Sequence, residues 1–443
     1  MRLTIKALCF ELAQEVYECI VIRSVECIVY RIDNNLMTLN YTLSTIHYSL
    51  TKMAKIHPFR GIFYNQEKVN ISSVIAPPYD IISDAEQEAF YQADPYNIIR
   101  LILGKTYLED TEENNRYTRA KEFKTTWEKE GILIEEETPS FYLYQQEWRL
   151  DGKEGVMLGI IASIEAEPYS ARAILPHERT LSGPKKDQLE SLKKTETNFC
   201  PIFLVYSDEE RKIERWLTPS GPPKIQLEYE KGLFCRLWQI KEEIEKLSAI
   251  FETKQLFIAD GHHRYETALA FKGKNRVMAM LLEKNRGGSI ILSAHRLLKN
   301  SLSTERLEGF LREKVKKEDI VSILSERKGI GVFGMVGKDE TYILTLKDGK
   351  ELDLAGSLKR VDVAILHNLI FDGQQEERDV AYTKDTREVF ARVENGEFAS
   401  GFLLRPTSFQ SVMDVARDSL YMPGKATYFF PKPFSGVVMH SLK

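Results

Sequence analysis

Apolar and polar positions alternate along the chain with two different periods, which predicts a mixture of strands and amphipathic helices. Short runs rich in β-branched and aromatic residues are typical of strands, and we expect these over residues 141–148, 156–164, 202–206, 256–258, 277–282, 290–293 and 341–346. Apolar residues at helical spacing predict helices over residues 83–93, 112–130, 184–196, 263–271, 303–315 and 360–370. This alternation predicts an α/β to α+β fold.

The first 52 residues differ in composition from the rest of the chain. They contain three of the five cysteines but none of the 25 glycines or 16 prolines, whereas average usage would give about three or four glycines. Met53 begins MAKIHPFRGIFYN, which has the character of a natural protein start. We therefore predict that residues 1–52 are a non-native extension from a misassigned start, with a genuine N-terminal helix pair as the alternative.

A second boundary is expected near residue 300. There the stretch LKNSLSTERLEGF begins a new predicted helix behind a Ser/Thr capping signal. The sequence thus predicts a core over residues 53–300 and a C-terminal α/β region over residues 301–443.

The net charge indicates which class of ligand to expect, and the cysteine content indicates the cellular compartment. The chain has 61 basic and 65 acidic residues, a net charge of −4, so no global field favours nucleic acid and the expected ligand is a small molecule. The five cysteines show no CxxC pair and an odd count, which fits a reducing cytoplasm. No apolar run approaches the ~20 residues that cross a bilayer, so no membrane partner is expected. The oligomeric state is left open.

The segment ADGHHRYETA, residues 259–268, carries the strongest chemical signal. An apolar strand runs directly into Asp260 and Gly261 and then into a helical pattern, a layout typical of an anion-binding helix start. Arg264 supplies a planar fork of donors for phosphate, and His262 or His263 is suited to proton transfer near neutral pH. The alternative interpretation is a structural corner in which Asp260 caps the helix.

A second candidate segment is ILPHERTLSGPKKD, residues 174–187. Here a strand-like end precedes His177 and Glu178, a plausible acid/base pair, and Lys185 follows as a cation for phosphate. The alternative is a solvated loop before a charged helix.

Three further positions complete the predicted substrate and phosphate contacts. Two prolines in IAPPYDIIS hold an extended approach to Tyr79 and Asp80, and we expect both to bind substrate together with Arg60 of HPFRG. For Asp80, helix capping is the alternative. Near the C-terminus, YMPGKATYFFPKPFSG offers Lys425 to phosphate, although aromatic strands with exposed lysines would give the same pattern.

Zinc is not expected. The chain lacks HExxH and paired CxxC motifs, and adjacent histidines such as His262 and His263 project about 100° apart on a helix, so they do not readily share a metal.

Together these motifs resemble the family called domain of unknown function 1015. The matching pieces are HPFRG, APPYD, LPHERTLSGPKKD, NFCPIF, ADGHHRYETA, AHRLL and MPGKATYFFPK, from Met53 to about Gly436. The DGHHR piece is further similar to the signature of the ParB-like and sulfiredoxin-like superfamily, which includes free serine kinases.

The resemblance implies a ParB-like nucleotide-binding core with a mixed sheet. By that likeness residues 261–264 would hold the phosphates of a nucleoside di- or triphosphate, Asp260 would bind Mg²⁺ or substrate, and Glu178 would be the general base. The chain departs from the superfamily pattern in one respect. Glu178 and Asp260 lie 82 positions apart, which is a longer insertion than is expected in a small kinase.

The leading hypothesis is therefore a nucleotide-dependent phosphotransferase acting on a small hydroxyl metabolite, with free serine as one candidate acceptor. The alternative is a non-catalytic nucleotide-sensing or nucleic-acid-associated regulator. A third hypothesis is a hydrolase of a phosphorylated metabolite that uses His262 or His263 as acid.

Overall fold

A computed structural model describes residues 29–32, 35–38, 53–180, 182–271, 275–371 and 379–443. The chain divides into two compact units, Met1–Thr51 and Lys52–Lys443. In the first, β1 (Val29–Ile32) and β2 (Asn35–Thr38) form an antiparallel pair. The remainder of the predicted extension lies outside the described residues.

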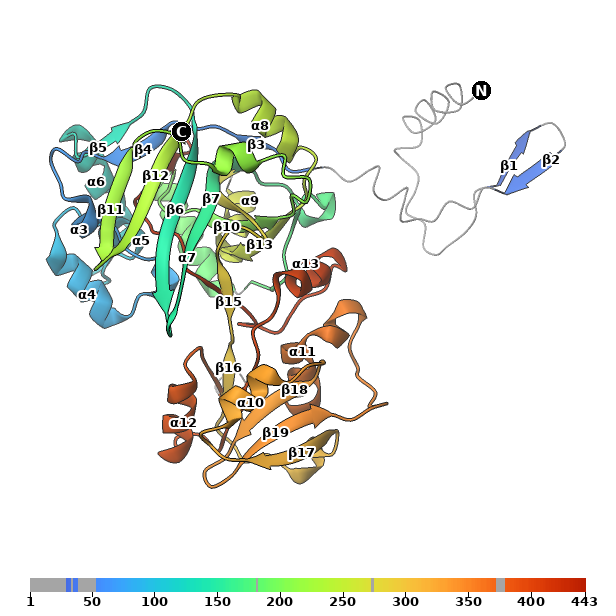
Figure 1. The fold of residues 1–443 in the computed structure, drawn as a ribbon. Coiled ribbons are helices and arrows are strands. Elements are labelled where there is room, and N and C mark those ends of the chain that lie inside the picture. Colours follow the sequence, from blue (N-terminus) through green and yellow to red (C-terminus); the bar gives the residue numbers. More distant parts are fainter. Residues whose placement is uncertain (1–28, 33–34, 39–52, 181, 272–274, 372–378) are drawn as a thin grey trace. The chain divides into compact units, whose positions relative to one another are not determined.

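The largest sheet among the described residues has nine strands (Figure 1). Its order is β11 (Ile225–Glu230), β12 (Leu233–Ile240), β6 (Phe141–Leu150), β7 (Lys153–Glu165), β14 (Arg276–Glu283), β10 (Ile202–Tyr206), β13 (Leu256–Asp260) and β8 (Ile174–Leu175), and β3 (Ile56–His57) also pairs with β7. The pairs β10 with β14 and β13 with β8 are parallel, and the other pairs are antiparallel. The sheet is therefore mixed, and the predicted α/β to α+β class is confirmed.

Both faces of this sheet are covered. All five residues of β10 are buried, and its successive side chains fall alternately into two apolar clusters, with Phe203 in one and Ile202 and Leu204 in the other. This alternation is what a strand of period two gives when a core lies on each side of it.

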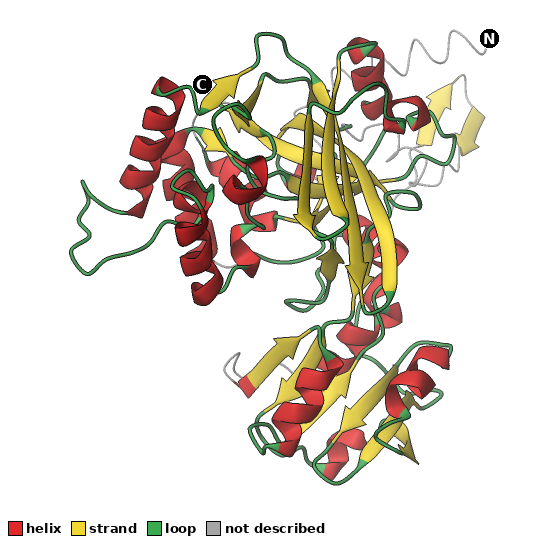
Figure 2. Cartoon of the chain, turned by 60° about the vertical axis from the view of Figure 1, so that its left-hand side comes forward, coloured by secondary structure: helices red, strands yellow, loops and turns green. Residues whose placement is uncertain are grey.

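The helices around this sheet begin where the sequence supplies capping groups. Ser83 and Glu86 form a reciprocal capping box at the start of α4 (Asp84–Ala93). Asn115 accepts two backbone N–H bonds at the start of α6 (Arg116–Lys129). Helix α7 (Ser182–Thr195) packs against both α6 and α9 (His262–Ala270), and Figure 2 shows a group of helices on the left of the long strands and further helices at their upper right. These helices are α3 (Ile71–Val74), α4 (Asp84–Ala93), α5 (Ile99–Ile102), α6 (Arg116–Lys129), α7 (Ser182–Thr195), α8 (Ile244–Phe251) and α9 (His262–Ala270), with 3₁₀ turns η1 (Tyr79–Ile81), η2 (Tyr169–Ala171) and η3 (Glu214–Leu217).

A second sheet, of six antiparallel strands among the described residues, is formed by the region around residues 295–403. Its order is β17 (Phe310–Val315), β19 (Thr341–Leu346), β18 (Val332–Val336), β21 (Ser400–Leu403), β16 (His295–Leu298) and β20 (Val380–Thr383). The accompanying helices are α10 (Ile320–Glu326), α11 (Asp362–Leu366), the π-helix η6 (His367–Phe371), α12 (Thr386–Glu394) and α13 (Phe409–Arg417), with η4 (Thr304–Leu307) and η5 (Gly356–Arg360).

The predicted helix over residues 303–315 is wrong. A single 3₁₀ turn, η4, ends before Gly309, and residues 310–315 form the edge strand β17, which pairs with β19. The stretch carries charges at three central positions, as exposed edge strands often do. Long-range pairing with β19 overrides the local helical pattern.

The C-terminal segment pairs with strands from earlier parts of the chain. β22 (Tyr428–Phe430) pairs with β15 (Ile290–Leu292), and β23 (Met439–Ser441) lies between β4 (Gly61–Tyr64) and β9 (Thr197–Asn198) in a sheet completed by β5 (Leu133–Glu135). Residues 421–432 are thereby carried to the ends of β8 and β13. The proposed division at residue 300 stays a prediction, and the six-stranded sheet already begins at His295.

Candidate functional site

A cleft of about 610 Å³ opens where helix α9 begins. Its volume falls within the ~300–1,000 Å³ typical of small-molecule sites. Six parts of the chain line it: η1, the loop after β8, the turn between β13 and α9, the link between residues 292 and 295, the end of β20, and the segment around β22. The lining residues are Tyr79, Asp80, Ile81, Glu178, Arg179, Asp260, Gly261, His262, His263, Arg264, Ser293, Ala294, Tyr382, Thr383, Lys384, Lys425, Thr427, Tyr428 and Lys432.

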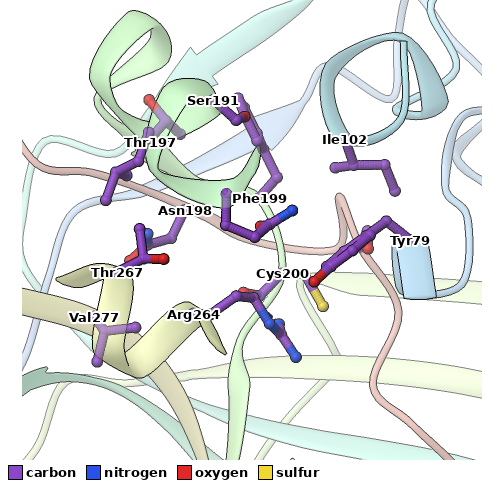
Figure 3. Close-up of a pocket in the computed structure, with 13 residues that line it drawn as sticks. Tyr79, Ile102, Ser191, Thr197, Asn198, Phe199, Cys200, Arg264, Thr267 and Val277 are labelled. Atoms are coloured by element: carbon purple, nitrogen blue, oxygen red, sulfur yellow. Dashed lines mark hydrogen bonds between the residues drawn. The ribbon is translucent and has the colours of Figure 1, made fainter. Parts of the chain in front are cut away.

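A smaller cavity, of about 60 Å³, adjoins this cleft and shares Tyr79 and Arg264 with it (Figure 3). Phe199, Cys200 and Val277 contribute to its mostly apolar wall. Burial raises the pKa of the Tyr79 phenol to about 12, so this side chain is neutral at physiological pH.

The turn into α9 depends on Gly261. Its φ of 92° lies in the left-handed region, and a Cβ at this position would approach Cγ2 of Ile202 to 2.8 Å. Gly261 occupies the N-cap and offers no side chain, so Asp260 does not cap the helix as the structural alternative required. Helix α9 thus begins at the cleft without a side-chain cap.

Asp260 is held between two cations. Lys432 Nζ lies 2.7 Å from Oδ1 of Asp260 and also pairs with Asp80, while Arg264 Nη2 lies 3.0 Å from Oδ2 of Asp260. Burial opposes ionisation of Asp260, but Lys432 and Arg264 outweigh it and lower the pKa of the carboxyl. Burial likewise opposes the charge on Lys432, and Asp260 and Asp80 raise its pKa. The four side chains form a mutually neutralised group.

The guanidinium group of Arg264 is largely occupied by contacts within the protein. Besides contacting Asp260, its Nη1 donates to the carbonyls of Pro201 at 2.8 Å and Cys200 at 3.3 Å, and 13% of its side chain is exposed. It therefore fixes the α9 turn against the start of β10.

The predicted Mg²⁺ site at Asp260 does not fit this geometry. Both oxygens of the carboxylate already accept from cations, and the described residues contain no group of three His, Cys, Asp or Glu side chains suited to a metal.

Glu178 lies in the same cleft, three residues after the end of the short strand β8. Lys425 donates its backbone N–H to Oε1 of Glu178 at 3.1 Å. Burial raises the pKa of the Glu178 carboxyl, and the negative charge of Asp260 adds to this effect. A carboxylate whose pKa is moved toward neutrality is suited to accept a proton.

His177, the predicted partner of Glu178, is fully buried and does not line the cleft. Its Nδ1 lies 2.8 Å from the carbonyl oxygen of Ile258 and its Nε2 lies 3.0 Å from Oγ1 of Thr427. Because a carbonyl only accepts, Nδ1 carries the proton and Nε2 accepts from the threonine hydroxyl. Burial lowers the pKa of His177 to about 4. The ring, next to Glu178 in the sequence, joins three segments, and both of its nitrogens have hydrogen-bond partners within the protein.

The two histidines of the α9 turn line the cleft with different degrees of burial. His262 is buried and packs edge-on against the His177 ring, with centroids 4.8 Å apart. Burial lowers the pKa of His262 well below its usual range and also lowers that of the half-buried His263. A neutral His262 is a poor general acid at physiological pH.

Two predicted site residues lie elsewhere. Lys185 Nζ binds Oε2 of Glu266 at 2.9 Å, and Arg60 Nη2 lies 3.5 Å from Oε2 of Glu135. Neither lines the cleft. In each case a surface carboxylate on a neighbouring element holds the cation in place.

Other residues of the cleft were not among the predicted site residues. Lys432 stood in the aromatic C-terminal segment with Lys425 but carried no distinguishing signal other than its position between two prolines. Tyr382 and Lys384 come from β20 and the residue after it, where no motif marks them. Only the pairing of β20 with β16 brings them to the cleft.

The chain belongs to a family of proteins of unknown function, DUF1015, whose model matches residues 56–364. The matched range includes Glu178 and the α9 turn, while Lys384, Lys425 and Lys432 lie beyond it. No curated protein matches the chain.

Solved structures with partial similarity include a conserved hypothetical protein from Pyrococcus furiosus, at 15% identity and a TM-score of 0.33, covering 59% of this chain and 90% of the other. A free serine kinase in complex with AMP has 16% identity and a TM-score of 0.33, covering 58% and 83%. A C-terminally truncated SbnI from Staphylococcus aureus has 12% identity and a TM-score of 0.35, covering 58% and 80%.

Among the described residues, no helix has the length and apolar character needed to cross a membrane.

Proposed function

We propose that the cleft belongs to a nucleotide-dependent phosphotransferase that acts on a small hydroxyl compound, with a free amino acid such as serine as one candidate acceptor. The observation that carries this proposal is the presence of Glu178, with its raised pKa, in the same cleft as the uncapped start of α9. General-base chemistry and phosphate binding call for these two features together.

In this proposal Glu178 accepts the proton of the acceptor hydroxyl. The hydroxyl oxygen forms a bond to the terminal phosphorus of the nucleotide, the bond from that phosphorus to the bridging oxygen breaks, and the electron pair leaves on the shortened nucleotide. The charge that develops on the transferred group is neutralised by cations of the cleft. The backbone N–H of Lys425 holds Glu178 in place for this step.

Asp80 is available to the ammonium group of an amino-acid acceptor. It lines the cleft beside Tyr79, and 35% of its side chain is exposed even though it pairs with Lys432. An acceptor with an ammonium group would add a second cation to this carboxylate.

The low pKa of His262 argues against the hydrolase hypothesis that uses this residue as acid. The regulator hypothesis shares the nucleotide site with the phosphotransferase and differs in lacking a chemical step.

The test is incubation of the full chain with ATP, ADP or CTP, Mg²⁺ and a panel of hydroxyl acceptors that includes L-serine, with phosphorus NMR to identify products. We expect a phosphomonoester of one acceptor and the shortened nucleotide in equal amounts. Calorimetric nucleotide binding without product from any acceptor would support the regulator. Phosphate release from a phosphometabolite in the absence of nucleotide would support the hydrolase.

A further inference from the structure

The cations of the cleft fall into two groups with different electrostatic surroundings. Lys432 and Arg264 are mostly buried and are neutralised by Asp80 and Asp260. Three others, Arg179, Lys384 and Lys425, are exposed at the cleft and form no ion pair with any carboxylate of the described residues.

Each of these three cations lies over a tyrosine ring instead. Arg179 is 5.3 Å from the ring centroid of Tyr421, Lys384 is 4.6 Å from that of Tyr428, and Lys425 is 5.3 Å from that of Tyr382. A tyrosine face attracts a cation without neutralising it, so the positive charge stays available to a ligand.

The three cations come from separate parts of the chain: the loop after β8, the end of β20 and the segment before β22. Among the described residues that line the cleft, Glu178 is the only carboxylate outside the neutralised group, and burial disfavours its ionisation. These described residues therefore carry an excess of two to three positive charges, which a ligand with several negative charges would balance.

We propose that Arg179, Lys384 and Lys425 bind the polyphosphate chain of the nucleotide, whereas the sequence predicted phosphate contacts from residues 261–264, Lys185 and Lys425. This deepens the proposed function and rests on it for the identity of the nucleotide. Arg264 becomes a positioning residue, because its guanidinium is committed to Asp260 and to the carbonyls of Pro201 and Cys200. Two of the three proposed ligands, Lys384 and Lys425, lie beyond the family match.

In this proposal the six-stranded sheet contributes to the cleft by supplying Lys384. Lys384 follows β20, an edge strand of this sheet, and its ammonium lies 3.4 Å from the hydroxyl of Tyr428 on β22. A phosphate contacting both Lys384 and Lys425 would link the sheet to the C-terminal segment.

The test uses inorganic tripolyphosphate as probe and isothermal titration calorimetry on the full chain. We expect Lys384→Gln and Lys425→Gln each to weaken tripolyphosphate binding about tenfold or more, since each removes a charge-assisted contact. The Lys425 variant keeps the backbone N–H that binds Glu178. Lys338→Gln, in the exposed turn between β18 and β19, is the matched control and should bind as wild type does.

Absence of tripolyphosphate binding by the wild type, or unchanged affinity in both cleft variants when each melts at the wild-type temperature, would overturn the proposal. Equal affinity for succinate would also overturn it, because charge alone would then account for binding. Lost tripolyphosphate binding in the variants, in a protein that transfers no phosphoryl group, would uphold the anion site while rejecting the phosphotransferase.

Discussion

Lys425 donates its backbone N–H to Oε1 of Glu178 at 3.1 Å and so joins two segments that are 247 residues apart in the chain. The contact holds the carboxylate in the cleft at which α9 begins. One short C-terminal segment thus supplies both a cation, the Lys425 side chain, and a support for the proposed base. Burial of this carboxylate raises its pKa, which is the electrostatic basis of its proposed role.

Gly261→Ala should destabilise the protein and weaken nucleotide binding. The left-handed φ of 92° and the 2.8 Å approach to Ile202 both oppose a Cβ, and we expect a loss of about 1 to 3 kcal/mol in the free energy of unfolding. Urea unfolding measures the loss. Gly152→Ala is the matched control, because Gly152 has a φ of 74° and an added Cβ there would meet open space. The smaller loss expected at Gly152 measures the cost of the left-handed backbone conformation alone. Equal losses in both variants would contradict the close packing at Gly261.

Lys432→Met should cost about 2 to 3 kcal/mol of unfolding free energy, because Asp80 and Asp260 would then face each other without their shared cation. The control Lys338→Met alters an exposed lysine and should change stability by less than about 0.5 kcal/mol. If adding Asp80→Asn to Lys432→Met recovers none of the lost stability, the ion-pair account is wrong.

Asp260 should make the protein acid-sensitive. Its folded-state pKa is lowered, so its contribution to stability is present above the unfolded value of about 3.9 and is lost as the pH falls through the folded value. The stability difference between wild type and Asp260→Asn should therefore be largest near neutral pH and shrink below about pH 4. Chemical unfolding at a series of pH values measures this difference. A stability difference that grows as the pH falls would contradict the lowered pKa of Asp260.

Arg60→Gln should leave nucleotide affinity within about twofold of wild type. The guanidinium pairs with Glu135 outside the cleft, and exposed pairs of this kind contribute little to stability. Calorimetry with the tightest-binding nucleotide tests this expectation. A tenfold loss of affinity with an unchanged melting temperature would return Arg60 to the site.

Much of the fold could be predicted from local pattern. The strands over residues 202–206 and 341–346 begin and end where the sequence indicated, because alternating or continuous apolar runs fix a strand without reference to its partner. The segment over residues 303–315 could not be predicted in this way. Its strand exists through pairing with β19, and its charged positions fit a helix surface as well as a sheet edge.

The candidate site was likewise predicted in part from local sequence, while the rest depends on long-range contacts. Polar residues at or shortly after strand ends, such as Asp260 and Glu178, are visible in the sequence, and the structure places both in one cleft. Which cations are already neutralised is not visible, because Lys432 and Arg264 meet Asp260 only after β13, α9 and the C-terminal segment have come together. The same holds for Lys384, whose place depends on β20.

The most direct measurement compares phosphoryl transfer and nucleotide binding in the wild type and in Glu178→Gln, with Glu135→Gln as a surface control of the same chemistry. The account predicts that Glu178→Gln abolishes product formation while nucleotide affinity, measured by calorimetry, stays within a few fold of wild type. Product formation by Glu178→Gln at a rate close to that of the control would contradict the assignment of Glu178 as the base.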